Sequence, residues 1–377
     1  MFKRTLAIGK KEIRQLMRDK RMLFVLFMFP IILLIIFGYA INFDVHHVKM
    51  VIYDRDKSVD SRDYVNALTS SDYFDLVGYI TDENQIKQIL DTQEAQCVIV
   101  FPENMSRDIY SGRNAEVQIL VDGVNGNTAG LIGNYLTLAT ASYSQKISNR
   151  VLTLAGMKAY SPVNLESIFW FNPSLTSTLF LIPGLIAMIL MITAVVAISL
   201  SIVREKERGT IEQIHVSPLS SIELLLGKTV PYVIIGLFIA ALILVAGHIL
   251  FGMPVKGSYI LLFLTTLLYL FAASNLGIFV SSVADSQQVA FQIATLVSLL
   301  PSVILSGFIF PIESMPAFIQ VITNITPAKF YIVILRSILL KGVGLSAFWH
   351  QIIYLFIFAF VFLGLATLIN KKSESVK

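Results

Sequence analysis

The sequence has few of the residues on which disulfide-bonded and metal-binding proteins depend. Cys97 is the single cysteine, which excludes an intramolecular disulfide and a site built from several thiolates. The five histidines are scattered without the spacing of metal ligands. Charged residues are also scarce, at 14% of the chain against roughly 25% in ordinary soluble domains. We therefore expect no metal site, and we expect most of the chain to lie in lipid.

The chain lacks a complete phosphate-binding loop. Gly227, Lys228 and Thr229 resemble the end of such a loop, but Ile222 stands where the loop needs a glycine to bring backbone N–H groups close to phosphates. No serine, cysteine or carboxylate group has catalytic spacing either. The sequence thus predicts a chain that is not an enzyme, has no catalytic residues and binds no cofactor itself.

Nucleic acid is excluded as a partner by the placement of the positive charge. The net charge is +4, but the basic residues flank apolar runs, as the positive-inside rule requires of a membrane protein. No basic groove with interleaved aromatic residues is present. The expected non-protein partner is membrane lipid.

Apolar residues make up 55% of the chain and fall into runs long enough to cross a bilayer. Residues 1–21 predict a cytoplasmic amphipathic helix at the membrane interface, because apolar positions near helical spacing alternate with Lys and Arg. Residues 22–42 predict the first span; this run is too long for the apolar region of a signal peptide, so we expect it to be retained.

Residues 43–173 differ from the rest, because short strand patterns alternate with helical ones. The expected strands are 48–53, 73–80, 95–101 and 116–121, and the alternation favours a sheet of parallel strands. We therefore predict an inserted α/β extracytoplasmic domain, with Cys97 as a buried thiol.

Residues 174–370 predict a five-helix transmembrane region, and 371–377 a cytoplasmic tail. The fold class is thus an α-helical polytopic membrane protein with six transmembrane helices. Residues 204–228 form a charged cytoplasmic loop, and 311–346 an extracytoplasmic re-entrant segment broken by prolines. The charge bias places both termini in the cytoplasm. Four basic residues fall on the opposite side as exceptions: Lys256, Lys329, Arg336 and Lys341.

The charges within residues 204–228 alternate in sign. Glu205, Glu207, Glu212 and Glu223 are interleaved with basic residues, a pattern typical of a solvated helix face. On periodicity alone we expect these side chains to be exposed. The spans themselves contain no carboxylate, which argues against a carrier driven by protons or sodium ions.

Three stretches resemble a known family. They are Glu205–Gln213 continuing through Ser217-Pro218 to Gly227-Lys228, Leu276-Gly277 through Gln288, and Ser306–Pro316 continuing to Arg336 and Gly342. With the six-span order, they resemble the membrane subunit of a type-2 ABC exporter, in the bacterial subgroup with a large extracytoplasmic domain between the first two spans.

The resemblance implies a permease of an exporter in the bacterial inner membrane. Its cargo is left open among drugs, lipids, glycolipids, peptides and sodium ions, and an apolar seam of Phe, Leu and Met favours an amphipathic or lipid-like substrate or a drug. The resemblance also implies separate ABC ATP-binding subunits that use ATP and Mg, and a second copy or a homologous permease subunit. The implied ATPase-coupling residues are Glu205, Arg208, Gly209, Thr210 and Glu212, with Arg14 as a weaker candidate. The alternative is a non-transporting receptor or scaffold whose extracytoplasmic domain binds a ligand.

Overall fold

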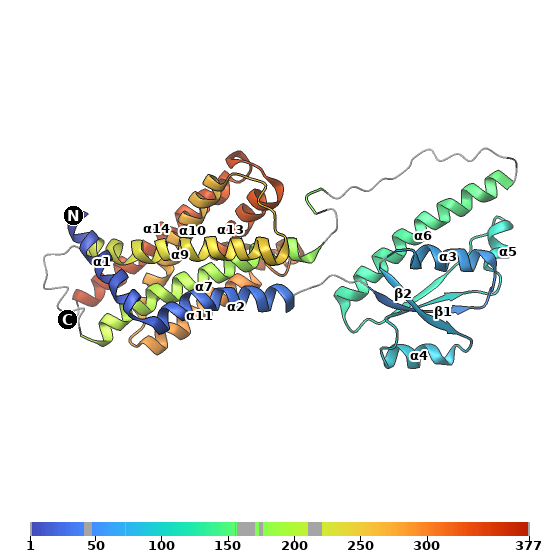
Figure 1. Cartoon of the computed structure of the whole chain (residues 1–377), viewed down its shortest axis with the longest axis horizontal. Coiled ribbons are helices and arrows are strands. Elements are labelled where there is room, and N and C mark those ends of the chain that lie inside the picture. Colours follow the sequence, from blue (N-terminus) through green and yellow to red (C-terminus); the bar gives the residue numbers. More distant parts are fainter. Residues whose placement is uncertain are drawn as a thin grey trace. The chain divides into compact units, whose positions relative to one another are not determined.

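A computed structural model describes residues 2–40, 47–71, 73–154, 156, 170–172, 176–209 and 221–375. The chain divides into two compact units. The first, here called the membrane unit, comprises Met1–Asn42 and Phe169–Lys377, and the second, called the α/β unit, comprises Phe43–Ile168. Figure 1 labels their elements.

The membrane unit is a bundle of long apolar helices, and among the described residues five are long and apolar enough to cross a bilayer. The chain is therefore a polytopic α-helical membrane protein, as the sequence predicts. The shorter apolar stretch Leu26–Ala40 belongs to α2, where the first span is expected. The helices are α1 (Phe2–Arg18), α2 (Lys20–Ala40), α7 (Ser177–Glu207), α9 (Ser221–Phe251), α10 (Tyr259–Val283), α11 (Gln287–Ile304) and α14 (Trp349–Ser375).

Helix α7 forms the core of this unit, because it packs against α2, α9, α10, α11 and α13. Close approach to α10 occurs at Gly277, where an added Cβ would lie 2.8 Å from the Val195 carbonyl oxygen. Polar side chains in the helices bond neighbouring backbones, as expected in lipid. The Tyr269 hydroxyl donates to the Ala187 carbonyl oxygen at 2.7 Å.

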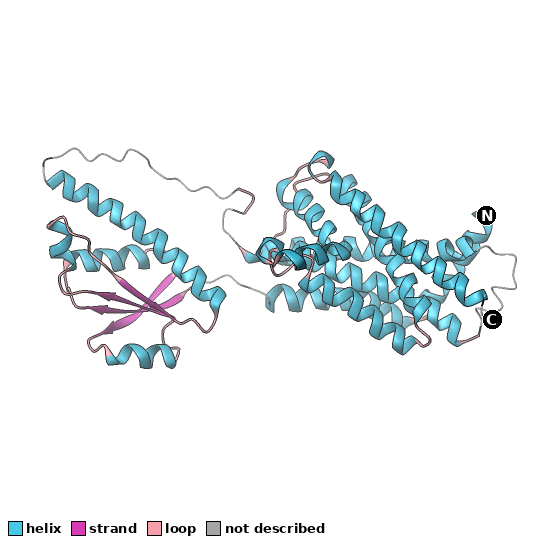
Figure 2. Cartoon of the chain, turned by 180° about the vertical axis from the view of Figure 1, so that it is seen from behind, coloured by secondary structure: helices cyan, strands magenta, loops and turns pink. Residues whose placement is uncertain are grey.

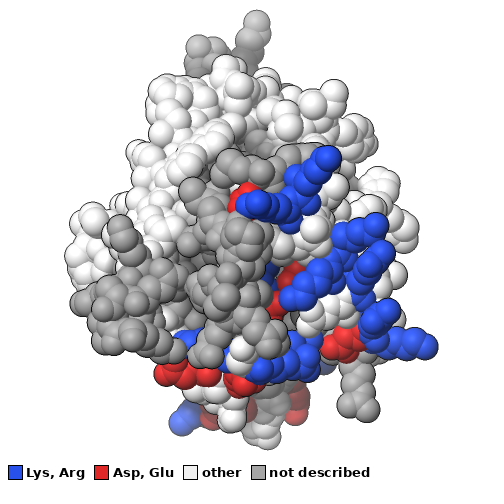
Figure 3. All heavy atoms as spheres, turned by 90° about the vertical axis from the view of Figure 1, so that its left-hand side faces the viewer, with Lys and Arg blue, Asp and Glu red and all other residues white. Residues whose placement is uncertain are grey.

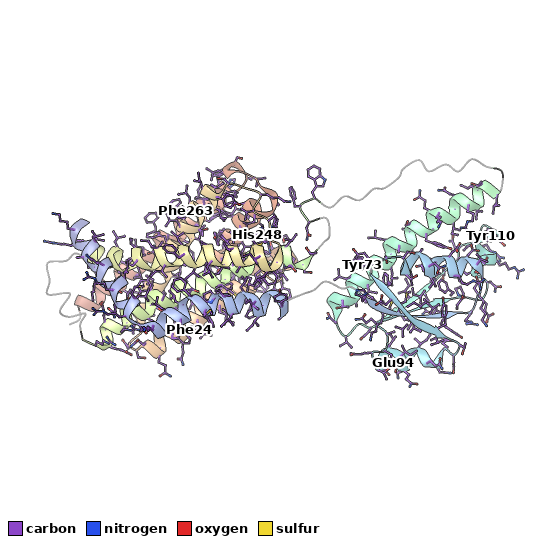
Figure 4. All side chains as sticks on the ribbon, viewed as in Figure 1. Phe24, Tyr73, Glu94, Tyr110, His248 and Phe263 are labelled. Atoms are coloured by element: carbon purple, nitrogen blue, oxygen red, sulfur yellow. The ribbon has the colours of Figure 1, made fainter. Side chains whose placement is uncertain are left out.

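Large apolar side chains cover the outside of the membrane unit. Phe24 of α2 and Phe263 of α10 are 63% and 53% exposed, and both point away from the bundle in Figure 4. An outward apolar surface of this kind suits contact with lipid chains.

The segment predicted as re-entrant is a chain of short helices. Its two apolar parts, Ala317–Ile325 and Pro327–Lys341, meet at an angle of 91°, which fits a broken span or a re-entrant loop. Pro327 occupies the first turn of α13, where its missing N–H leaves no unsatisfied donor. The elements are η1 (Ile312–Ser314), α12 (Ala317–Ile322), η2 (Thr323–Ile325), α13 (Pro327–Arg336), the π-helical turn η3 (Ser337–Lys341) and η4 (Leu345–Ala347).

The α/β unit contains a four-stranded sheet of order β2-β1-β3-β4. Strand β1 pairs in parallel with β2 and β3, but β4 pairs antiparallel with β3. The elements are β1 (Val48–Asp54), α3 (Val59–Thr69), β2 (Phe74–Ile80), α4 (Asn84–Asp91), β3 (Cys97–Phe101), α5 (Met105–Tyr110), β4 (Gln118–Val121) and α6 (Gly126–Leu154).

The expectation of parallel strands is therefore confirmed for β1, β2 and β3 and wrong for β4. A parallel connection must carry the chain back along the whole length of a strand, usually on a helix. The connections from β2 to β3 and from β3 to β4 are equally long, at residues 81–96 and 102–117, so the alternation of strands and helices in the sequence does not fix the direction of the last strand. The chain turns back beside β3 instead, and Val100 pairs with Gln118.

Helices cover both faces of this sheet, as Figure 2 shows. Tyr64 of α3, Met105 of α5 and Leu136 of α6 pack on one face, while Ile86 of α4 packs on the other. Cys97 is fully buried in the first of these two cores, as the sequence predicts.

Candidate functional site: a buried charge cluster

Three buried charged side chains meet where α1, α7 and α9 come together. Glu12 of α1 is 3% exposed, Glu205 of α7 is 4% exposed and Lys228 of α9 is 3% exposed. We call these residues, with the Ser201, Tyr232 and Lys11 side chains that bond them, the charge cluster.

The ammonium group of Lys228 lies between the two carboxylates. Its Nζ atom is 2.9 Å from Oε1 of Glu12 and 2.7 Å from Oε2 of Glu205. The Ser201 hydroxyl donates to Oε2 of Glu12 at 3.0 Å, and the Tyr232 hydroxyl lies 3.5 Å from the same oxygen. Lys11 forms an ion pair with the other oxygen of Glu205. Two carboxylates and two ammonium groups thus balance in charge.

This arrangement corrects the expectation of a solvated face. Glu205 and Glu223 are each 4% exposed, whereas Glu207 is exposed as predicted. Charge alternation in the sequence shows which residues screen one another, but it does not reveal a third helix that covers them. Because α1 packs against α9, the side chains nearest α1 lose their water and keep their charges by pairing.

The contact between α1 and α9 depends on a glycine. A Cβ added at Gly227 would lie 2.8 Å from Cβ of Ile8 and 3.1 Å from the carbonyl oxygen of Thr5. The absence of a side chain therefore lets the two helices approach closely enough for Glu12 to reach Lys228.

The last turn of α7 also bonds the turn between α10 and α11. Nζ of Lys206 is 2.8 Å from Oδ1 of Asp285 and donates to the Ala284 carbonyl oxygen at 2.9 Å. This contact with Lys206 holds the pKa of the Asp285 carboxyl below its usual range. The Gln287 backbone N–H donates to Glu207 at 2.6 Å. The start of residues 204–228 is thus joined to two neighbouring parts of the bundle.

Basic side chains gather on the face of the membrane unit that carries these helix ends, as Figure 3 shows. An open depression of about 500 Å³ lies beside the charge cluster. Nη1 of Arg204 is 3.5 Å from Oδ2 of Asp19 within it. Its lining residues are Gln15, Arg18, Asp19, Lys20, Arg204 and Arg208.

The predicted coupling residues are separated by the structure. Glu205 belongs to the charge cluster, and Arg208 lines the depression. Gly209 follows α7 with a φ of +66°, a left-handed conformation that favours glycine in a turn. Arg14 is exposed on α1 and lies outside the cluster. Thr210 and Glu212 lie outside the described residues.

Glu12 is a site residue that was not predicted from the sequence, although its position in α1 provides a signal. Glu12 is the only acidic residue of α1, and it lies four residues from both Ile8 and Leu16, on one helical face. Leu16 is buried on that face. A single carboxylate on the face of a basic helix that packs against the bundle indicates a buried ion pair.

Among the described residues, no group of three His, Cys, Asp or Glu side chains is arranged to hold a metal ion.

Comparison with known proteins identifies the family. Residues 20–368 match the family described as ABC-2 family transporter protein. The chain belongs to this family. It is 32% identical over 354 residues to the "Probable multidrug ABC transporter permease YbhR" of Escherichia coli (strain K12), covering 93% of this chain and 94% of that protein. The ABC-2 chain described here is thus a permease subunit of an ABC transporter.

Two further relatives also match over nearly their whole lengths. The "Probable multidrug ABC transporter permease YbhS" of E. coli K12 is 30% identical over 374 residues, 98% of this chain and 97% of that protein. The "Inner membrane transport permease YhhJ" of E. coli K12 is 29% identical over 383 residues, 97% of this chain and 96% of that protein. The charge cluster therefore lies within an ABC-2 permease subunit, for which the family implies ATP-binding partner subunits and a dimer.

Proposed function

We propose that this permease exports an amphipathic or lipid-like substrate, or a drug, by alternating access driven by separate ATP-binding subunits. The observation that carries the proposal is the charge cluster, which joins α1 to the two helices flanking residues 204–228. Two relatives of this protein are named as probable multidrug permeases, which supports an apolar or amphipathic cargo.

In this proposal the charge cluster transmits a push from the ATPase. Residues 204–228 comprise the end of α7, the connection 208–220 and the start of α9, and both helices are 31 residues long. A displacement at the loop moves α7 and α9 together, because Lys228 of α9 forms an ion pair with Glu205 of α7. The same lysine also pairs with Glu12, so α1 moves with them. Since α7 is the core of the bundle, its movement changes the packing against α10 and α11. The coupling candidates in or next to the loop are Glu205, Arg208, Gly209, Thr210 and Glu212.

The proposed orientation places the charge cluster at the cytoplasmic surface of the inner membrane. The basic face of Figure 3 supports it, because the cytoplasmic leaflet favours Lys and Arg. Both termini are then cytoplasmic and the α/β unit is extracytoplasmic. The name of YhhJ as an inner membrane permease agrees with this location. The alternative of a receptor or scaffold has less support, since all three relatives are named as permeases.

The substitution Glu205→Gln tests the coupling role. It leaves Lys228 and Lys11 without one carboxylate, and breaking a buried ion pair destabilises the arrangement by about 3–5 kcal/mol. We expect the purified complex with its ATP-binding subunits to lose at least tenfold in dye export per ATP hydrolysed, measured in proteoliposomes.

Glu94→Gln serves as the matched control, because Glu94 is exposed in the α/β unit. This control should export at the wild-type rate. Wild-type export and wild-type ATP turnover in Glu205→Gln would contradict the coupling proposal, and failure of the wild-type complex to export any amphiphile would contradict the transport proposal.

A further inference from the structure

Helix α13 ends in an arginine that is held by neutral groups. Nη2 of Arg336 donates to the carbonyl oxygens of Phe180 at 3.1 Å and of Gly307 at 3.0 Å. The guanidinium carbon lies 3.9 Å from the centroid of the Phe180 ring. Nε of Arg336 is buried and has no hydrogen-bond partner among the described residues. The side chain is thus anchored through one nitrogen and retains donors that no group of the described residues uses.

Arg336 forms no ion pair within 4.0 Å in the described part of the chain, and Glu313 acts on its charge only from a longer distance. Glu313 is the only acidic residue of 311–346, and the ion pairs found within 4.0 Å in the described part of the chain do not join it to Arg336. The contacts with two carbonyl dipoles and an aromatic face stabilise the cation but leave its net charge intact. A half-buried cation in a weakly polar environment favours an anion beside it.

Other basic residues lie at the same end of the membrane unit. The Lys256 backbone N–H donates to the Leu339 carbonyl oxygen at 3.1 Å, which places Lys256 beside η3. Leu339 is three residues after Arg336 in the chain. Lys341 ends η3 and is exposed. Phe180 belongs to the first turn of α7 and Glu205 to its last, so this end is opposite to the charge cluster. Two of the basic residues that the positive-inside rule leaves unexplained, Lys256 and Lys341, therefore lie at the same end of the membrane unit as Arg336.

We propose that Arg336 is an anion-binding subsite that takes the phosphate group of an amphiphile at this end of the permease. A guanidinium presents planar donors that match phosphate oxygens and bind them with charge-assisted hydrogen bonds. The Phe180 ring, 37% exposed, offers an apolar surface next to it for the alkyl part. The shared ligand chemistry is a phosphate group, either carried as a monoester by a lipid-like chain or free in solution as inorganic phosphate.

Binding by the isolated permease tests this proposal without any transport step, so its outcome is independent of the export proposal. Dodecyl phosphate and dodecanol form a matched pair of probes that differ only in the phosphate. In neutral dodecyl maltoside micelles, we expect dodecyl phosphate to raise the thermal unfolding midpoint of the wild type at a concentration at least tenfold lower than dodecanol requires. Inorganic phosphate is the third probe: stabilisation by it indicates recognition of the free ion, and its failure indicates that the alkyl chain is also needed.

Variants separate anion recognition from a purely structural role of the two carbonyl contacts. Arg336→Met should abolish the preference for dodecyl phosphate, and Arg336→Lys should retain part of it because the charge remains. Lys341→Met removes the same charge from an exposed neighbour and should keep the preference. The proposal is overturned if the wild type responds equally to dodecyl phosphate and dodecanol, an outcome that needs no variant to fold. It is also overturned if Arg336→Met keeps the preference, or if Lys341→Met loses it to the same extent.

Discussion

One ammonium group, that of Lys228, joins three helices at the charge cluster. Its two carboxylate partners come from α1 and α7, while its own backbone belongs to α9. Such a buried pair contributes little net stability compared with well-packed apolar groups, but losing one member leaves an uncompensated charge. The cluster therefore selects which helices pack together and in which register along their axes. Removing one member costs more free energy of folding than the intact cluster contributes.

The Cys97 thiol provides a test at the scale of a single residue. Burial raises the pKa of Cys97 to about 12, so only about one thiol in ten thousand is ionised at pH 8. Because the folded pKa lies above the unfolded value near 9, this thiol favours the folded state below pH 9 and loses that contribution as the pH rises further. We expect no reaction with a maleimide at pH 8 in native protein and complete reaction after unfolding.

An exposed thiol supplies the comparison for this experiment. Val124 is 86% exposed in the α/β unit, so Val124→Cys in a Cys97→Ala background should react under native conditions. Equal rates of reaction for native and unfolded Cys97 would show that the thiol is accessible and that its burial is misassigned.

At the scale of elements, the ends of α7 and α9 extend beyond the apolar runs. Residues 204–228 are expected from the sequence to form a charged loop between two spans, but α7 continues to Glu207 and α9 already begins at Ser221. The additional turns contain charged residues, which helices accept where partners are near. Hydrophobicity predicts which part of a helix lies in lipid, and it does not predict where the helix itself ends.

The close contact of α1 with α9 predicts a strong effect of a single methyl group. In Gly227→Ala, the new Cβ would lie 2.8 Å from Ile8 Cβ, and such overpacking typically costs about 1–3 kcal/mol. We expect a lower thermal unfolding midpoint and faster proteolytic removal of α1. Gly247→Ala is the control in the same helix, because its Cβ would meet only Ile182 Cγ2 at an ordinary 3.7 Å. An equal effect of the two substitutions would contradict the proposed close packing.

At the scale of the whole molecule, the sequence predicted the class of protein but not the contacts of its functional site. The apolar runs predict the helices of the membrane unit, because each is long enough to identify alone. The short strands of the α/β unit were also found, although not the direction of β4. A buried partner for Glu12 could be predicted from its helical face, but not that this partner is Lys228, which is 216 residues away. No local pattern encodes such a pairing.

The proposed orientation predicts that a thiol in the α/β unit and a thiol on α1 are accessible to reagents from opposite sides of the inner membrane. In a Cys97→Ala background, Val124→Cys should react with a membrane-impermeant maleimide added to intact cells, because the α/β unit is placed outside the inner membrane. Lys10→Cys, exposed on α1, should react only after the cells are permeabilised. The reverse pattern of labelling would overturn the orientation.

The 216-residue separation between Glu12 and Lys228 also has a consequence during synthesis. At roughly 5–20 residues per second, α9 leaves the ribosome about 10 to 40 s after α1. During that interval α1 has neither Lys228 nor the surface of α9 to bind, while α2, the α/β unit and α7 are made. Helix α1 is therefore translated well before its partner and reaches its final place only once α9 has been made.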